Sequence, residues 1–415
     1  MLSELRNLLA SVCGIAAVLG ILSTSCAENS PTARPKPPWL VLAHDDTGDF
    51  GPATPGTKTA GWQEALDDCV AQSKDLYVKG GYGGRKAVYH IDETIRFPPA
   101  QDFKIDGGVY VINFRGTKTD DDAVVIDSAM NCEYKLGIIV YGGKGAGLRI
   151  RPEKPVPIDG FPVVIETLIS SQGIADPQPF VAGQRKAGRG LVLDSSQASI
   201  SYSKFDFAAV LNFSTNIQIE GRHGFFSNTF TCEHLHTNAH NSSLCAIGPQ
   251  ATANTFRFGI GVDQGASGVQ GIELLGARNT LDVSTRLGGF SPARQLILSP
   301  SAHGNQINLR TAADPLTLIT DRAEQPTNQI TWTGPPAPIQ RIQGKPGSYV
   351  YVQRLFPAVV SVTGTESSRV VFERSGESID YGFAQDRDIL MSVGDRLRID
   401  GKTAPALVVV PFKTR

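Results

Sequence analysis

Five short segments in the middle of the chain alternate apolar and polar residues, and they recur at nearly constant intervals. Each segment starts with Asn-Thr or Asn-Gln and continues with two apolar residues separated by one polar residue. The segments start at Asn228, Asn254, Asn279, Asn305 and Asn328, so the intervals are 26, 25, 26 and 23 residues. Alternation with a period of two is typical of a β-strand, and repetition at a fixed interval is typical of a solenoid. The pattern therefore predicts a solenoid whose coils are built from strands.

The interval also fits the geometry of stacked parallel strands. Neighbouring strands lie about 4.8 Å apart with one whole coil between them, and three strands with their turns use roughly 22 to 28 residues. A second apolar strand precedes several of the Asn residues, at residues 244–247, 269–275 and 295–298. Within each segment the two apolar side chains point inward, so the polar residues between them point outward. These outward residues are Thr231, Arg257, Asp282, Asn308 and Thr331.

The five repeated Asn residues themselves are interpreted as structural. Each lies where two strands of a coil meet, so its side-chain amide can satisfy backbone groups of the turn. Its backbone tolerates the left-handed conformation that such a turn requires. Identical amides on successive coils can also hydrogen-bond to one another as a ladder. We therefore expect an Asn ladder rather than a row of ligands.

Both ends of the solenoid need closure. Residues 60–74 carry Trp62 and Leu66 at helical spacing, with Thr59 available as the N-cap, and this helix is expected to cover the first coil. The solenoid is expected to span residues 39–340. After a Pro-rich break, a small β domain is predicted at 341–415, with strands at 348–352, 359–362, 369–372, 396–399 and 406–410.

The N-terminal part of the chain carries a family resemblance. It has an Asp-rich start, the helix around Trp62, a strand at 76–78, and Tyr89-His90-Ile91 leading to Ile95-Arg96-Phe97. Residues 46–116 thereby resemble the pectate-lyase-like superfamily, although 55–59 and Lys79-Gly80-Gly81 depart from its usual pattern. The resemblance extends through the Asn repeats to about residue 340. It implies an all-β fold, a right-handed parallel β-helix, and a carbohydrate substrate.

Composition narrows the class of partner. The 415 residues include 39 Lys plus Arg against 40 Asp plus Glu. Nucleic-acid-binding proteins show a basic surplus or a clustered basic stripe, so this balance disfavours nucleic acid. The 43 Gly and 26 Pro suit many short strands joined by tight turns. The sequence shows no Walker loop, nucleophile elbow or dinucleotide fingerprint in a strand-to-helix setting.

The first 25 residues have the layout of an export signal. Arg6 precedes an apolar stretch at 8–22, which is too short for a comfortable membrane span and ends in Ser23-Thr24-Ser25-Cys26. A Cys after small residues resembles a bacterial lipoprotein cleavage box, with Ser23 where that box has Leu. Two alternatives stay open: lipid attachment at Cys26 in the cell envelope, with the membrane reached only through that anchor, or ordinary secretion. Residues 26–38 are expected to form a flexible tether.

The remaining cysteines leave another alternative open. Cys69, Cys132, Cys232 and Cys245 allow two disulfides in three connectivities, and Cys232 with Cys245 closes the shortest loop. Buried free thiols are an equally good interpretation, because Cys232 lies on the inward side of its segment.

Three His residues follow Cys232 closely. In a strand, His234 and His236 share one side, which suits two ligands of one metal or an acid and base pair. The inward parity of Phe230 and Cys232 would bury both rings, so we expect a turn to intervene and release them. A structural role in that turn is the alternative.

A charged outward row is the second candidate for chemistry. Arg257 and Asp282 lie one coil apart and are expected to touch, while Glu273 faces outward from the preceding strand. A glycoside hydrolase needs an acid with a base or nucleophile, whereas a lyase needs a base and a cation that neutralises a uronate carboxylate. The alternative is a surface ion pair of little energetic weight. The expected catalytic residues are Asp282, Glu273, Arg257, His236 and His234, and the expected substrate-binding residues are His240, Asp263, Asn308 and Arg286.

The cofactor and the activity remain open predictions. Thr119-Asp120-Asp121-Asp122 offers oxygen ligands for Ca²⁺, yet it lacks the spacing of a loop cage, and an acidic solvated turn is the alternative. No other metal is assigned, and the oligomeric state is not predicted. The expected function is an exported enzyme, lyase or glycoside hydrolase, that cleaves a polysaccharide along the outer face of the coils. The alternative is a noncatalytic glycan-binding or structural surface protein.

Overall fold

The described part of the chain consists of eleven segments separated by gaps. The computed structural model describes residues 39–81, 87–116, 120–153, 164–170, 188–238, 240–262, 267–285, 296–311, 314–363, 368–383 and 387–412.

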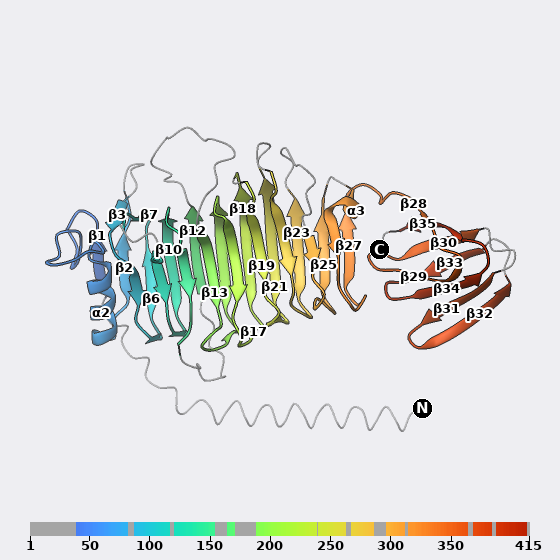
Figure 1. Cartoon of the computed structure of the whole chain (residues 1–415). Coiled ribbons are helices and arrows are strands. Elements are labelled where there is room, and N and C mark those ends of the chain that lie inside the picture. Colours follow the sequence, from blue (N-terminus) through green and yellow to red (C-terminus); the bar gives the residue numbers. More distant parts are fainter. Residues whose placement is uncertain are drawn as a thin grey trace, which may run out of the picture. The chain divides into compact units, whose positions relative to one another are not determined.

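The largest sheet, sheet A, gathers one strand from each successive coil, with a second strand in the first two (Figure 1). Every pairing within it is parallel, and adjacent strands are one coil apart in the sequence. Its thirteen strands are β1 (Leu40–Ala43), β2 (Leu76–Lys79), β3 (Ala87–Ile91), β6 (Lys104–Gly107), β7 (Tyr110–Phe114), β10 (Glu133–Val140), β12 (Val164–Ser170), β15 (Lys204–Leu211), β18 (Thr229–Thr237), β21 (Thr255–Val262), β23 (Thr280–Thr285), β25 (Gln306–Arg310) and β27 (Gln329–Thr333).

A second parallel sheet, sheet B, forms another side of the coils. Its nine strands are β4 (Ile95–Phe97), β8 (Val124–Ile126), β11 (Ala146–Ile150), β13 (Arg189–Asp194), β16 (Thr215–Glu220), β19 (Ser243–Ile247), β22 (Gln270–Leu274), β24 (Leu296–Leu298) and β26 (Ile319–Asp321). Two short parallel ladders add β5 (Ala100–Gln101) with β9 (Ala129–Met130), and β14 (Ile200–Ser201) with β17 (Phe225–Phe226) and β20 (Ala251–Thr252). The predicted parallel β-solenoid is therefore confirmed, with about eight turns.

The five Asn residues form the expected ladder. The Nδ2 of Asn228 donates to Oδ1 of Asn254 at 3.0 Å, and the same bond continues through Asn279 and Asn305 to Asn328. Each Nδ2 also donates to a backbone carbonyl of the preceding coil. All five Asn residues are at most 3% exposed. The ladder thus provides hydrogen-bond partners for buried backbone groups of the turns that are not paired within the sheets.

The expectation that the Asn residues themselves adopt the left-handed conformation was wrong. Before the first four Asn residues, the left-handed residue is the one immediately preceding: Ser227, Ala253, Arg278 and Gly304 have φ values of 57°, 56°, 56° and 63°. The reason is that the Asn amide must point into the turn, where it bonds the next coil. The preceding residue therefore makes the reversal of direction.

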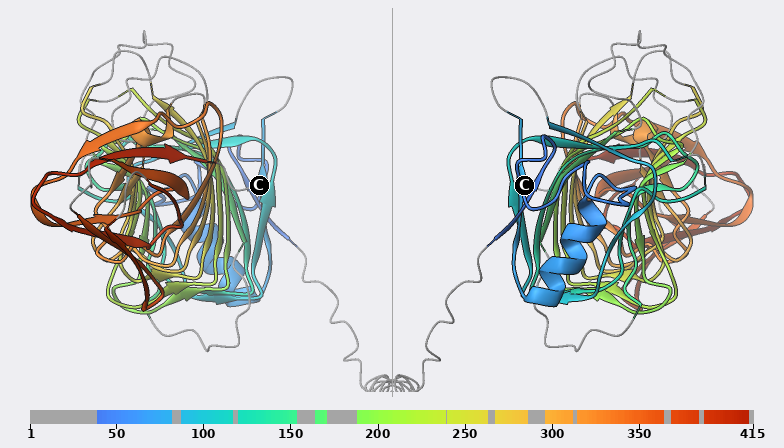
Figure 2. Two further views of the ribbon diagram at one scale, coloured as in Figure 1. Left: turned by 90° about the vertical axis from the view of Figure 1, so that its right-hand side faces the viewer. Right: turned by 90° about the vertical axis from the view of Figure 1, so that its left-hand side faces the viewer.

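The predicted helix covers the first coil, as the end-on views show (Figure 2). Helix α2 (Trp62–Gln72) is shorter than the predicted 60–74, and Gly61 in the left-handed conformation is its N-cap. The hydroxyl of Thr59 still accepts the N–H of Gln63 at 3.0 Å. The Trp62 ring lies 5.8 Å from the Tyr89 ring and is fully buried. Neither α2 nor the short helix α3 (Pro315–Leu318), the two helices of the described segments, is long and apolar enough to cross a membrane.

The interior of the coils is apolar and contains stacked aromatic rings. Phe207 and Phe230 on neighbouring coils have ring centroids 5.3 Å apart, with an angle of 22° between the ring planes. Phe225 and Phe256 are stacked in the same way, at 6.3 Å and 19°. Because the inward residues of sheet A recur at equivalent positions, one continuous core runs through the coils.

The cysteines within the described segments are free. Cys69, Cys132, Cys232 and Cys245 are all buried thiols, so the alternative of a Cys232–Cys245 disulfide is not realised in this structure. Burial raises the pKa of the Cys69 and Cys232 thiols to about 12. These thiols therefore behave as small apolar core residues.

The C-terminal region folds into two antiparallel sheets. The predicted strands are present with slightly wider bounds, and three further strands, β28 (Gln340–Gln343), β32 (Glu377–Phe383) and β33 (Arg387–Met391), were not predicted. Residues of both sheets enclose a second apolar core that includes Val360, Phe372, Met391 and Leu397. In order, sheet E contains β28 (Gln340–Gln343), β35 (Ala406–Pro411), β30 (Ala358–Thr363) and β33 (Arg387–Met391), and sheet F contains β29 (Gly347–Val352), β34 (Arg396–Gly401), β31 (Arg369–Arg374) and β32 (Glu377–Phe383).

Candidate functional site

The outward row of sheet A is built by the register of its parallel strands. Arg257 on β21 pairs with Asp282 on β23, which pairs with Asn308 on β25. The row continues to Thr331 on β27 and, in the other direction, to Thr231 on β18. Since the apolar neighbours of these residues point into the core, the polar side chains stand on the outer face at the spacing of one strand.

The contact expected between Arg257 and Asp282 is present. The Arg257 Nε lies 3.7 Å from an Asp282 carboxylate oxygen, and the two side chains are 63% and 37% exposed. Asp282 also accepts a hydrogen bond from Nδ2 of Asn308 at 2.7 Å, and Asn308 in turn accepts one from the Thr331 hydroxyl at 2.7 Å. Asp282 is therefore held from both neighbouring coils. At this exposure the ion pair alone adds little stability.

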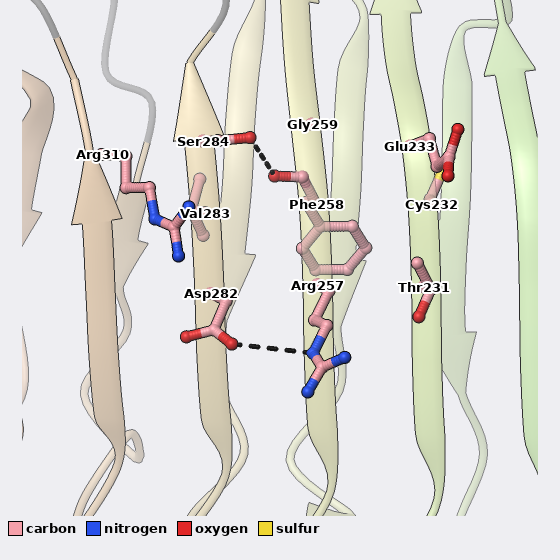
Figure 3. A pocket seen from close by; sticks show the side chains of 10 residues that line it. All are labelled: Thr231, Cys232, Glu233, Arg257, Phe258, Gly259, Asp282, Val283, Ser284 and Arg310. Carbon is pink, nitrogen blue, oxygen red and sulfur yellow. Dashed lines mark hydrogen bonds and ion pairs between the residues drawn. The ribbon is translucent and has the colours of Figure 1, made fainter.

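This row forms one wall of an open hollow of about 510 Å³ on the outer face of sheet A (Figure 3). The hollow has the size of a site for a small organic ligand. Two carboxylates and two guanidinium groups line it, together with hydroxyls and Gly259 of β21. The lining residues are Thr231, Cys232, Glu233, Arg257, Phe258, Gly259, Asp282, Val283, Ser284 and Arg310.

Two of these charged residues were missed as candidates. Glu233 lies two residues after Thr231, and Arg310 lies two residues after Asn308, so the same period of two places both of them on the outer face. Within the described residues, no ion pair engages the Glu233 carboxylate or the Arg310 guanidinium. Both groups are exposed and can receive a ligand.

The turn expected before His234 does not exist, and this prediction was wrong. Strand β18 continues to Thr237, and a register shift between Cys232 and Leu235 changes its parity instead. Glu233 and His234 are consecutive exposed residues, while His236 is half-buried. A β-bulge inserts one extra residue into a strand and so lets two neighbouring side chains reach the same face. The bulge therefore brings His234 out beside Glu233 without ending the strand.

Gly259 shows how closely the next strand approaches this bulge. A Cβ at Gly259 would lie 2.1 Å from the carbonyl oxygen of Glu233, a distance that no side chain tolerates. A Cβ at Gly261 would lie 2.7 Å from Cδ2 of the His236 ring. The two glycines of β21 thus leave room for the bulged backbone and for the imidazole.

A second hollow adjoins the first along sheet A. Lys135, Thr167, Asp206 and Ala208 contribute to its lining, and Glu233 lines both hollows. Its lining comes from β6, β7, β10, β12, β15 and β18, whereas that of the first comes from β18, β21, β23 and β25. An open groove therefore crosses successive coils, with Glu233 where the two hollows meet.

Of the remaining predicted residues, the two that the structure describes, Glu273 and His240, line neither hollow. Glu273 lies on β22 of sheet B, where it accepts a hydrogen bond from the Ser299 hydroxyl at 2.9 Å. It faces outward there, as predicted, but the turn between the strands places it on another side of the coil from Asp282. The Nδ1 of His240 accepts the backbone N–H of Ser267 at 3.0 Å. Outside the described residues lie Asp263, Arg286 and Cys26.

Among the described side chains, no three His, Cys, Asp or Glu residues converge as metal ligands. Asp122, expected in a solvated turn or a Ca²⁺ site, faces the Arg149 guanidinium at 2.6 Å and accepts the N–H of Ala146 at 2.7 Å. Arg149 also lies 3.5 Å from Asp194. Asp122 therefore belongs to a half-buried ion-pair network on the outer side of sheet B.

Comparison with known proteins gives no family for this chain. No family model matches the chain, and the search of curated proteins finds no match.

Proposed function

We propose that this protein is an exported enzyme that cleaves an acidic polysaccharide lying in the groove of sheet A. The observation that carries the proposal is the grouping of Glu233, Arg257, Asp282 and Arg310 around one hollow. A parallel β-solenoid is compatible with carbohydrate-active proteins of this architecture. Export is the expectation drawn from residues 1–25 of the sequence.

The two carboxylates suit the acid and base of glycoside hydrolysis. Asp282 faces a guanidinium and accepts an amide N–H, so it suits the role of an ionised base that activates water. Glu233 has no ion-pair partner within the described segments and suits the acid that protonates the leaving oxygen. In this assignment, His234 beside Glu233 is available to relay protons to solvent.

The separation of the two strands favours inversion of the anomeric centre. Strand β21 lies between β18 and β23, so the strands that carry Glu233 and Asp282 are roughly 10 Å apart. Retaining glycosidases place their carboxyl groups only about 5 Å apart, whereas inverting enzymes leave about 6.5 to 9.5 Å for a water molecule. Glu233 also lies two residues beyond the register row of Asp282, which pairs with Arg257 and through it with Thr231. The pair is therefore too widely separated for the retaining arrangement.

The two arginines point to an acidic substrate. Arg257 is 63% exposed although it faces Asp282, and Arg310 has no ion pair among the described residues. A guanidinium binds a carboxylate with two parallel hydrogen bonds, so both residues suit the uronate groups of an acidic chain. A neutral glycan would leave the Arg310 charge without a partner.

A noncatalytic glycan-binding protein is the second candidate. It is favoured by the resemblance of the Arg257–Asp282 pair to the exposed ion pairs farther along sheet A, such as Lys104–Glu133 at 3.1 Å and Lys135–Asp106 at 3.5 Å. In that case the charged row would bind a glycan without breaking a bond.

Incubation of the purified protein with a panel of acidic and neutral polysaccharides tests the proposal. Hydrolysis releases new reducing ends, and proton NMR of the first products shows whether the anomeric configuration is inverted. A lyase releases products with an unsaturated uronate that absorbs ultraviolet light, which would replace the hydrolytic mechanism. Binding of an acidic glycan without any product would favour the second candidate and contradict the enzyme proposal.

A further inference from the structure

The outer face of sheet E exposes a row of apolar side chains. Leu390 pairs with Val359, and Val359 pairs with Val410, so one register row crosses β33, β30 and β35. Ile339 directly precedes β28, whose first residue pairs with Val409, and it extends the row to the fourth strand. Leu390 is 61% exposed, Ile339 58% and Val410 38%. Such a contiguous row differs from isolated surface apolar residues and indicates an interaction surface.

The neighbouring outward row carries opposite charges at its two ends. Arg341 on β28 pairs with Val408, Val408 pairs with Ser361, and Ser361 pairs with Asp388 on β33. Three strand spacings separate Arg341 from Asp388, which is roughly 14 Å. The two charges therefore cannot meet within one molecule. Asp388 accepts a hydrogen bond from the Ser361 hydroxyl, and Arg341 has no ion pair in the described part of the chain.

The outer face of sheet F provides a contrast within the same region. Most charges on it are paired within the face: Arg398 lies 3.9 Å from Glu373 and 3.2 Å from Asp400, and Arg369 is paired with Asp380. Arg396 has no ion pair among the described residues, and Val350, which pairs with Arg398, is 52% exposed. Sheet E differs in its continuous apolar row and in the two separated and complementary charges beside it.

We propose that the outer face of sheet E binds a second copy of this chain about a two-fold axis. The axis runs parallel to the strands, between β30 and β35, and reverses the order of the four strands in the partner. Each register row of one copy then lies against the same row of the other copy, with its residues in reversed strand order. Arg341 of one copy meets Asp388 of the other, and Ile339 meets Leu390, in both halves of the interface.

Self-complementarity is the reason for choosing a second copy as the occupant. A two-fold interface uses the same patch on both subunits, so a face must carry both a group and its complement at symmetric positions. Sheet E does so twice, once with opposite charges and once with apolar ends. The arrangement also has the usual anatomy of an interface, with apolar contacts bordered by charged residues. The inference does not depend on the proposed enzymatic function.

Sedimentation velocity of the purified protein at increasing concentration tests this interface. We expect a reversible dimer whose population rises with concentration. Arg341→Glu and Asp388→Arg each place like charges opposite one another twice, so either change should weaken the dimer about tenfold or more. The double variant Arg341→Glu/Asp388→Arg exchanges the charges and should restore dimerisation toward the level of the unmodified chain.

Two further variants control this experiment. Lys402→Glu makes the same charge change in an exposed turn outside sheet E and should leave the dimer unchanged. Leu390→Lys should weaken the dimer through the apolar row, while circular dichroism confirms that each variant is folded. A protein that stays monomeric at every concentration would overturn the proposal. Failure of the double variant to recover, while the single variants are weakened, would also overturn the proposed two-fold arrangement.

Discussion

Asn254 donates twice to the side-chain oxygen of Asn279, from its backbone N–H at 3.0 Å and from its Nδ2 at 3.0 Å. The same double donation links Asn228 to Asn254, Asn279 to Asn305, and Asn305 to Asn328. Each amide therefore satisfies a turn in its own coil and bonds that coil to the next. Loss of one amide leaves buried groups on two coils without partners.

Replacement of one ladder residue should destabilise the fold strongly. Asn279→Ala removes the acceptor of two buried donors, and an unsatisfied buried group costs about 1 to 3 kcal/mol. We expect a loss of roughly 3 kcal/mol in the free energy of unfolding, measured by urea denaturation. Gln306→Ala, an exposed residue on the outer face of the next strand, is the control and should change stability little. Equal losses for both variants would contradict the structural role of the ladder.

Gly259 offers a second test, because its neighbour forms the bulge at the groove. Gly259→Ala would place a methyl group 2.1 Å from the Glu233 carbonyl oxygen, so β18 and β21 must separate. A loss of stability of about 1 to 3 kcal/mol is expected from such overpacking. Gly142→Ala is a suitable control, since a Cβ there meets no atom within 4 Å. Thermal unfolding of the two variants should differ clearly, and similar melting temperatures would argue against the close approach at the bulge.

The cysteines should be unreactive in the folded protein. Burial raises the pKa of Cys232 to about 12, and the pKa of Cys245 is also raised by burial. Alkylation at pH 8 without reductant, followed by peptide mass spectrometry, should therefore label neither residue in the native state. Both should be labelled once the chain is unfolded in the same buffer. Detection of a Cys232–Cys245 cross-link after unfolding would show that these thiols are oxidised.

A pH effect is expected from His90. Burial, and then the charge of Arg115, lower the pKa of His90, and Nη2 of Arg115 lies 3.1 Å from Nε2 of the ring. The folded state thus prefers the neutral imidazole, whereas the unfolded chain binds a proton near pH 6.5. The stability contributed by this contact is present above that pH and is lost as the pH falls through about 6.5. Because the side chain is exposed, only the sign is predicted.

His90→Asn isolates this effect. Urea unfolding of the variant and of the unmodified protein at several pH values should show a smaller decrease in stability below about pH 6.5 for the variant. Parallel stability curves would rule out a contribution from His90.

The strand period carried most of the fold prediction and only part of the site prediction. The orientation of inward residues such as Phe256 and outward residues such as Arg257 could be predicted from alternation alone, because successive side chains of a strand point to opposite faces. The bulge at Glu233 and His234 did not follow, because two consecutive polar residues between Cys232 and Leu235 are equally compatible with a turn that ends the strand. Glu273 faces outward as predicted, but the pattern does not give the angle of the turn that places it on sheet B, away from Asp282.

Arg310 should govern the preference for acidic substrates. Arg310→Ala removes a guanidinium that has no ion pair within the described segments, so the KM for an acidic polysaccharide should rise about tenfold while kcat changes less. The exposed Arg322, which follows a strand of sheet B, is the matched control, and Arg322→Ala should have little effect. An unchanged KM in Arg310→Ala would remove this residue from the binding site.

The most direct test of the proposed activity uses an acidic polysaccharide that the unmodified protein cleaves. The measurement is the rate at which the variants Glu233→Gln and Asp282→Asn release reducing ends from it. Both changes keep the shape of the side chain and remove its ability to transfer a proton, so each should lower kcat about 100-fold or more. Glu377→Gln, on the exposed strand β32, should retain full activity. Full activity in both groove variants, or no cleavage by the unmodified protein, would contradict the proposal that the groove of sheet A is a catalytic site.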